Sequence, residues 1–139
     1  MTVSIQTRDQ IEAVVRALID AYAKQDVAGV MALIGDGFAG YGAGSDAVIA
    51  SREEFRGRLE QTFRESGAIA VAVSGLQIHA VGTVAWIAAR AEIETAAGSR
   101  RERVAVRLTA VLEGTGHAWR FVQSHVSLPA PAPLHGLFG

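Results

Sequence analysis

The sequence predicts a single α+β domain in which helices come first and a meander of antiparallel strands follows. Up to about residue 67, apolar residues recur at helical spacing behind residues that cap helices. From Ala68 onward, β-branched residues and alanines alternate in long runs that are separated by glycine turns. Helices and strands that are segregated in this way are typical of α+β domains. A chain of 139 residues is long enough for one sizeable hydrophobic core.

The first helix is expected to begin at a capping box formed by Thr7 and Gln10. Apolar residues then follow at positions that share one helical face. They are Ile11, Val14, Val15, Leu18, Ile19 and Tyr22. The segment is therefore predicted to form an amphipathic helix.

Asp26 is placed to cap a second, short helix, which Gly35 and Gly37 would end. The apolar side of this helix is expected to consist of Val27, Val30, Met31, Leu33 and Ile34.

A third helix is predicted behind Ser51 and Glu54, which form a second capping box. Phe55, Leu59 and Phe63 follow at a spacing of four residues, and Gly67 is placed to end the helix.

Strands account for the remaining segments. The glycines at 40, 42 and 44 predict a small hairpin within residues 38–50, between the second and third helices. Four long strands are expected after Ala68, joined by turns at Gly82, at Gly98 and at 114–116. Their predicted ranges are about 70–81, 83–95, 101–113 and 117–128.

Alternation assigns the residues of the long strands to two faces. Small and aliphatic rows suit packing beneath the helices: Ala85, Ile87, Ala89, Ala91 and Ile93, with Val104, Val106, Leu108, Ala110 and Leu112. The opposite face is predicted to carry Trp86, Arg90, Glu92, Glu94, Arg107, Thr109, Trp119, Phe121, Gln123, His125 and Ser127. Tryptophan and phenylalanine side chains are too large to be left exposed there without cause, so this face is expected to meet a partner.

Composition excludes several classes of function. The chain has no cysteine, which excludes disulfides and cysteine nucleophiles, and the four histidines show no metal-ligand spacing, so neither a metal nor a cofactor is expected. A net charge of −1 gives no reason to expect nucleic acid or an anionic membrane as a partner. No secretory signal or membrane-spanning run is apparent, and a cytoplasmic location is expected.

The closing residues resemble those of a known family. Arg107-x-Thr109, the run from Trp119 to Val122, and His125-x-Ser127 are similar to the ending of SnoaL-like proteins in the NTF2-like (cystatin-like) superfamily, and to that of the calmodulin-kinase association domain. The resemblance covers about residues 8–128. It implies a strongly bent sheet wrapped around the helices, an apolar conical pocket between them, and homodimers made by sheet faces.

Some members of this superfamily are ketosteroid isomerases, which the resemblance implies would need a carboxylate shortly after the second helix. Gly42 occupies that position here, and the nearest carboxylates, Asp36 and Asp46, lie in glycine-rich turn sequence. Because Gly42 supplies no carboxylate, an enzyme of the ketosteroid isomerase or polyketide cyclase type, acting on a small apolar substrate, is the alternative expectation. The main expectation is a dimeric domain for small-molecule binding or association.

Ligand binding and dimer formation each predict a set of residues. Polar contacts to a small apolar ligand are expected from Tyr22, Tyr41, Arg107 and His125. The dimer interface is expected to use Trp86, Arg90, Arg107, Thr109, Trp119, Phe121, Gln123 and His125. Two local alternatives are open: Arg107 either binds a carboxylate of a ligand or pairs with Glu92 or Glu94, and His125 is either a general base beside Ser127 or an interface residue.

One domain is predicted over residues 1–128, followed by a proline-rich tail over 129–139. The prolines prevent the tail from continuing a paired strand, and Leu134, Leu137 and Phe138 are expected to be able to dock on a neighbour.

Overall fold

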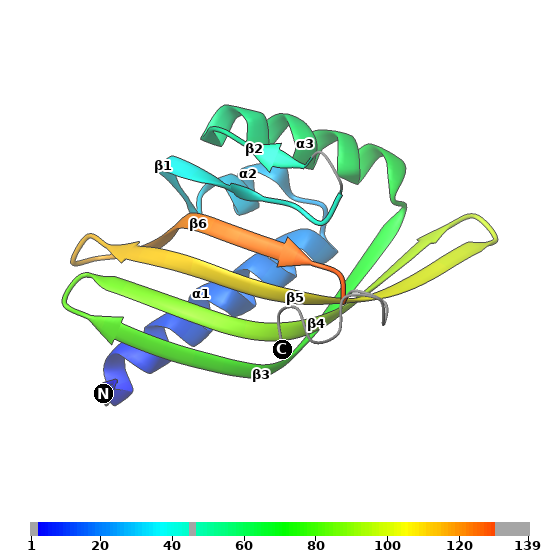
Figure 1. Cartoon of the computed structure of the whole chain (residues 1–139). Helices are drawn as coiled ribbons and strands as arrows, with labels where there is room; N and C mark the ends of the chain where they lie inside the picture. Colours follow the sequence, from blue (N-terminus) through cyan, green and yellow to red (C-terminus); the bar gives the residue numbers. More distant parts are fainter. Residues whose placement is uncertain (1–2, 45–46, 130–139) are drawn as a thin grey trace, which may run out of the picture.

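The computed structural model describes residues 3–44 and 47–129 as three helices on one side of a curved six-stranded sheet (Figure 1). The predicted tail lies outside these residues apart from Pro129. The elements are α1 (Ile5–Ala23), α2 (Val27–Met31), β1 (Ile34–Tyr41), β2 (Val48–Ile49), α3 (Arg52–Glu65), β3 (Ala68–Val81), β4 (Val84–Ala97), β5 (Arg100–Gly114) and β6 (Trp119–Ser127). In the described part of the chain, no helix is long and apolar enough to cross a membrane.

The helix caps agree with the sequence in two cases of three. The side chains of Asp26 and Ser51 accept hydrogen bonds from the backbone N–H groups of Gly29 and Glu54, as predicted. The start predicted for the first helix is wrong, because Ser4 caps α1 by accepting from the N–H of Thr7. A serine three residues upstream provides the same cap one turn earlier.

The second helix is shorter than predicted. It ends at Met31. Leu33 and Ile34 are not part of the helix, because they pair with strand β6 instead. The N–H of Phe121 donates to the carbonyl of Leu33 (2.8 Å), and Ile34 opens strand β1 opposite Phe121. Pairing with a distant strand thus overrides the local helical pattern.

The sheet has the order β2-β1-β6-β5-β4-β3. The four long strands form the predicted antiparallel meander, and β1 and β2 form the predicted hairpin. The hairpin joins the sheet through a parallel pairing of β1 with β6. The sheet is therefore mixed: the four long strands are antiparallel as predicted, and the hairpin adds one parallel pairing that the sequence did not predict.

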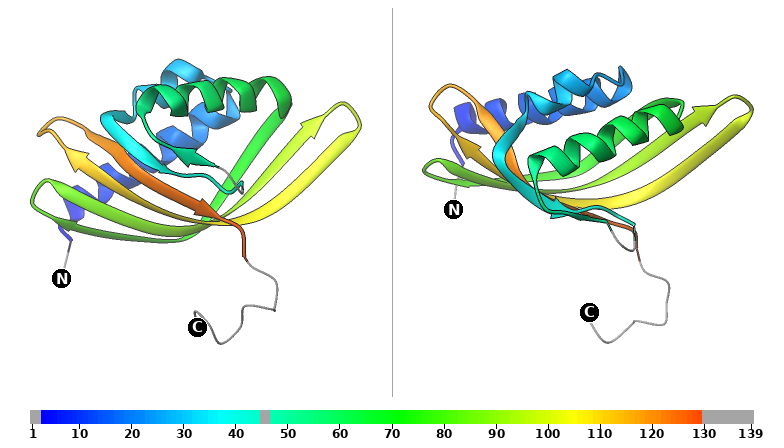
Figure 2. Two further views of the ribbon diagram at one scale, coloured as in Figure 1. Left: turned by 45° about the horizontal axis from the view of Figure 1, so that its top comes forward. Right: turned by 90° about the horizontal axis from the view of Figure 1, so that it is seen from above.

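Two irregularities interrupt the alternation of side chains along the long strands. In β3 the pairing with β4 shifts between Ser74 and Gln77, where Gly75 has a φ of 63°. In β6 the pairing with β5 passes from Phe121 to Gln123, so Val122 is an extra residue. Such bulges bend a strand and increase its twist, and Figure 2 shows the curved sheet with the helices on its inner side.

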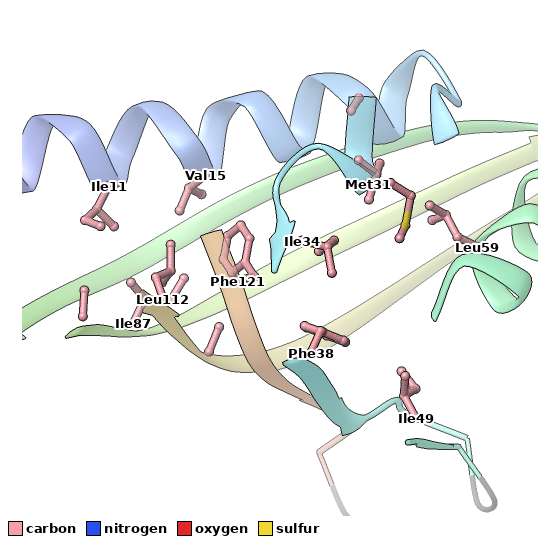
Figure 3. Close-up of a cluster of buried hydrophobic side chains, with 14 of the residues drawn as sticks. Ile11, Val15, Met31, Ile34, Phe38, Ile49, Leu59, Ile87, Leu112 and Phe121 are labelled. Carbon is pink, nitrogen blue, oxygen red and sulfur yellow. The ribbon is translucent and has the colours of Figure 1, made fainter. Parts of the chain in front are cut away.

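The core lies between the helices and the inner face of the sheet (Figure 3). Its largest fully buried side chains are Phe38, Ile11, Leu112 and Val30. The ring of Phe38 lies 5.0 Å from that of Phe55, centroid to centroid, which joins β1 to α3. None of the buried residues in the described part is polar or charged.

Candidate functional site

The helices cover only the inner face of the sheet, so the side chains of its outer face are open to contact. Antiparallel pairing brings outer residues of neighbouring strands together in rows. One row joins His79, Trp86, Val111 and Gln123, and the next joins Gln77, Ala88, Thr109, His125 and Tyr41. This outer face is the candidate functional site.

Large apolar side chains are exposed on this face, and we call them the outer-face cluster. They are Tyr41 (54% exposed), Val48 (55%), Val81 (54%), Val84 (40%) and Trp86 (40%). Two imidazoles extend the cluster. His79 stacks on Trp86 with ring centroids 5.7 Å apart, and the ring of His125 lies 5.6 Å from that of Tyr41. These side chains form two groups near opposite edges of the outer face, Tyr41 and Val48 on β1 and β2, and Val81, Val84 and Trp86 on β3 and β4. Exposed apolar side chains of this size are typical of a surface that another molecule covers.

Two arginines lie beside the cluster. Arg90 and Arg107 are direct partners across β4 and β5, so two positive charges face one another. Among the described residues, no carboxylate lies within ion-pair distance of either guanidinium. Of the two alternatives for Arg107, pairing with Glu92 or Glu94 is wrong, because Arg107 lies opposite Arg90 and Glu94 pairs with Arg103 at 2.5 Å. The Arg90–Arg107 pair therefore presents positive charge that no described carboxylate neutralises at ion-pair distance.

Because of the bulge at Val122, two of the predicted interface residues lie on the inner face of the sheet. Phe121 pairs with Leu112 and is only 3% exposed, so it belongs to the core. Trp119 is half-buried on the same inner side, and its indole Nε1–H donates to Gln10 Oε1 on α1 at 2.9 Å. The prediction that these two aromatics share a face with Gln123 and His125 is wrong. An extra residue moves every side chain that precedes it to the other face.

The other predicted interface residues do lie on the outer face. Arg90, Arg107, Thr109, Gln123 and His125 are exposed there together with Trp86. Four further residues of this face were not predicted from the sequence: His79, Val81, Val84 and Val48. The two-residue turn at Gly82 was the usable signal, because it places Val81 opposite Val84 and His79 opposite Trp86.

The four residues predicted to contact a ligand are divided between the two sides of the sheet. Tyr41, Arg107 and His125 lie on the outer face, whereas Tyr22 lies on the helical side, edge-on to Phe63 at 5.4 Å. Burial raises the pKa of the Tyr22 phenol to about 12, so the phenol stays protonated and able to donate at neutral pH. The structure does not bring these four residues to one site.

A second region of interest lies on the inner face, where the β4–β5 hairpin runs beyond the helices (Figure 2). A hollow of about 270 Å³ separates the C-terminal end of α3 from this hairpin. Its lining consists of Thr62, Glu65, Ser66, Thr95, Ala97, Arg100 and Glu102. Val104 is 39% exposed here, so the helices do not cover the whole of the predicted inner row.

Apolar residues on this part of the inner face are buried without joining the main core. Ile69, Ala89, Ala91 and Val106 are 8%, 8%, 7% and 5% exposed, yet they lie outside the main cluster of buried side chains. These four residues make the inner face beyond the core apolar. Tyr22 and Phe63, near the ends of α1 and α3, contact each other and pack against the main core. The carbonyl of Gly67 accepts a hydrogen bond from Gln25 Nε2, which ties these two helix ends together.

Groups for acid–base or metal chemistry are scarce on the inner face. Asp36 is exposed in β1, Gly42 follows that strand, and Asp46 lies outside the described residues. Residues 3–44 and 47–129 contain no group of three or more histidine, aspartate or glutamate side chains arranged to hold a metal ion. The titrating groups on this face include the Tyr22 phenol and, at the hollow, the carboxylates of Glu65 and Glu102.

Comparison with protein families matches residues 11–131 to a model described as a SnoaL-like domain. Comparison with functionally curated proteins finds no match.

Solved structures show the same fold. A protein of unknown function from Pseudomonas putida is NTF2-like and superimposes with a TM-score of 0.84 at 17% identity, covering 95% of this chain and 93% of that one. A proposed dehydratase of the NTF2-like family from Streptomyces avermitilis gives 0.81 at 15% identity, with 88% and 96% covered. A proposed calcium/calmodulin-dependent protein kinase II association domain from Xanthomonas campestris gives 0.78 at 18% identity, with 88% and 87% covered. At these identities the similarity establishes the fold alone.

Proposed function

Because this chain belongs to the SnoaL-like domain family and has the NTF2-like fold, we propose that it is a self-associating domain whose outer sheet face pairs with a second copy. The observation that carries this proposal is the outer-face cluster beside two arginines without carboxylate partners. Covering exposed Trp86, Tyr41 and three valines would remove a large apolar area from water. The likeness to a proposed kinase association domain supports the same reading.

A variant at Trp86 tests self-association. Aspartate at this position should dissociate the dimer, because aromatic residues at the centre of an interface contribute much of its binding energy. We expect wild type to be a dimer and Trp86→Asp a monomer in light scattering at concentrations on the order of tens of micromolar.

Val104→Asp is the matched control for that experiment. Val104 is exposed to the same degree as Trp86, 39% against 40%, but it lies on the inner face of the sheet. The control should remain a dimer. A wild-type protein that is monomeric under these conditions contradicts self-association.

A second function, binding of a small apolar ligand, has a separate observation in its favour. The inner face carries buried apolar residues outside the main core, and a hollow lined mainly by polar residues separates α3 from the β4–β5 hairpin. The protonated phenol of Tyr22 contacts Phe63 near the end of α3. Pockets for small molecules are commonly apolar with a few polar groups that fix orientation. In this proposal Tyr22 donates a hydrogen bond to the ligand, and the outer-face residues Tyr41, Arg107 and His125 take no part.

The alternative is an enzyme of the ketosteroid isomerase or polyketide cyclase type, and one structural neighbour is a proposed dehydratase. Reactions of this kind need a group that accepts or shuttles a proton close to the substrate. Among residues 32–44, which follow the second helix, the only carboxylate is that of the exposed Asp36, and the imidazole of His125 is on the opposite side of the sheet. These positions favour binding over catalysis.

The ligand proposal predicts a difference between wild type and Tyr22→Phe. Organic extraction of the purified proteins, followed by mass spectrometry, should release a small apolar compound from wild type and about tenfold less from the variant, since one buried hydrogen bond contributes about 1 kcal/mol or more. Tyr41→Phe is the control on the outer face and should retain the compound. Extracts of wild type without any bound compound would count against this function.

A further inference from the structure

The outer face of β5 presents a short row of residues with opposite charges at its two ends. Arg107, Thr109, Val111 and Glu113 project from this face at every second position, while Leu108, Ala110 and Leu112 between them face the helices. At about 3.4 Å per residue, Arg107 and Glu113 are on the order of 20 Å apart. The row therefore runs from positive to negative across the middle of the outer face.

Both end charges lack an ion-pair partner within the described chain. Arg107 faces Arg90 across β4, and no carboxylate reaches either arginine. Glu113 faces Arg120 across β6, but Arg120 Nε donates to the carbonyl of Ala32 at 3.3 Å and forms no ion pair with Glu113. A facing anion would relieve the repulsion between the two arginines.

When the row of a second copy faces this row in the reverse direction, the positive end of each row meets the negative end of the other. Ala110 is the midpoint between Arg107 and Glu113, so a two-fold axis across the strands at Ala110 exchanges these two positions. The same axis exchanges Thr109 with Val111 on β5. On β4 it exchanges Trp86 with Ala88, which places a large exposed side chain against a small one.

Building on the proposed self-association, we infer that the outer face binds a second copy of this chain about a two-fold axis at Ala110, with Arg107 contacting the partner's Glu113. In an isologous contact each pairing occurs twice, so Glu113 also contacts the partner's Arg107. Arg90 lies beside Arg107 and offers the same carboxylate a second guanidinium. The axis keeps the strands of the two sheets roughly aligned, which is one of the two usual ways in which sheets pack.

Charge reversal distinguishes this arrangement from other dimers. Arg107→Glu places two glutamates together at both contacts, and Glu113→Arg does the same with two arginines. Each variant should raise the dissociation constant of the dimer by about tenfold or more, since like charges brought together in an interface are strongly unfavourable. When the two variants are mixed, every contact in the mixed dimer again joins arginine to glutamate.

The mixture is therefore expected to form heterodimers in excess of the statistical one half, measured by native mass spectrometry with one variant isotopically labelled. Added salt should reduce this excess, because it screens exposed charges. Arg8→Glu, an equal charge change at an exposed position of α1, is the control and should neither weaken the dimer nor favour heterodimers.

The outcomes separate the two proposals. Suppose that Trp86→Asp dissociates the wild-type dimer, but that neither charge reversal weakens it and the mixed variants form no excess of heterodimers. This result overturns the Arg107–Glu113 contact and leaves self-association standing. A monomeric wild type overturns both. Circular dichroism of each variant verifies that it is folded, as expected for substitutions at exposed positions.

Discussion

Replacing Phe121 with alanine should lower the free energy of unfolding by about 3–5 kcal/mol, the usual cost of removing a buried phenylalanine. The side chain is 3% exposed and lies in the main core cluster, opposite the fully buried Leu112. Truncation would leave a cavity where β5 and β6 meet the helices. Chemical denaturation followed by circular dichroism measures the loss of unfolding free energy. If this free energy depends on denaturant concentration with the same slope as in wild type, the unfolding reaction itself is unchanged.

Gln123→Ala is the control, since Gln123 lies two residues further along the same strand. Without the bulge, these two side chains would share a face and both variants would behave alike. With Val122 as the extra residue, Gln123 is exposed and its replacement should change stability by less than about 0.5 kcal/mol. Equal losses for the two variants would contradict the register of β6.

Replacing Gly40 with alanine should destabilise the protein by about 3 kcal/mol or more. A Cβ at this position would lie 2.1 Å from the carbonyl oxygen of Ser124 on β6. The oxygen belongs to the backbone and cannot rotate away, so the hairpin and β6 would have to separate. Thermal unfolding should show a clear fall in the midpoint. Because Tyr41 and Val48 of the outer-face cluster belong to this hairpin, dimer formation should weaken as well.

Gly37→Ala is a control in the same strand. A Cβ at Gly37 meets no atom within 4 Å, so this variant should unfold close to wild type. A mild effect at both positions would indicate that β1 lies further from β6 than the structure places it.

Local signals in the sequence predicted most of the architecture. The caps at Asp26 and Ser51 depend on hydrogen bonds between residues three apart, which a sequence shows directly. The turns at Gly82 and Gly98 have φ values of 57° and 61°, which glycine adopts without a steric penalty. The antiparallel meander follows from these turns.

The errors arose where distant segments decide the local structure. Leu33 and Ile34 continue a helical pattern, but hydrogen bonding to Phe121 places them at the start of a strand. The bulge at Val122 leaves no mark in the sequence, since a valine is an ordinary strand residue. Period-two counting therefore assigned Trp119 and Phe121 to the wrong face.

The candidate site was predicted in part for the same reason. Trp86, Arg90 and Arg107 follow from alternation along two adjacent strands, and the sequence placed all three on the outer face. Tyr41 was predicted to contact a ligand and was not placed on the outer face, because its neighbour across the sheet, His125, is far away in the chain. Only the parallel pairing of β1 with β6 brings these two rings together.

That parallel pairing also constrains the order of folding. Strands β3 to β6 can pair one after another, each with the strand that precedes it in the chain. Strand β1 is made early but pairs with the last strand, and contacts between segments so far apart in sequence form slowly. During synthesis the apolar residues Ile34 and Phe38 must therefore wait for β6 before they are buried, and this interval is when the nascent chain is most exposed to misassembly or chaperone capture.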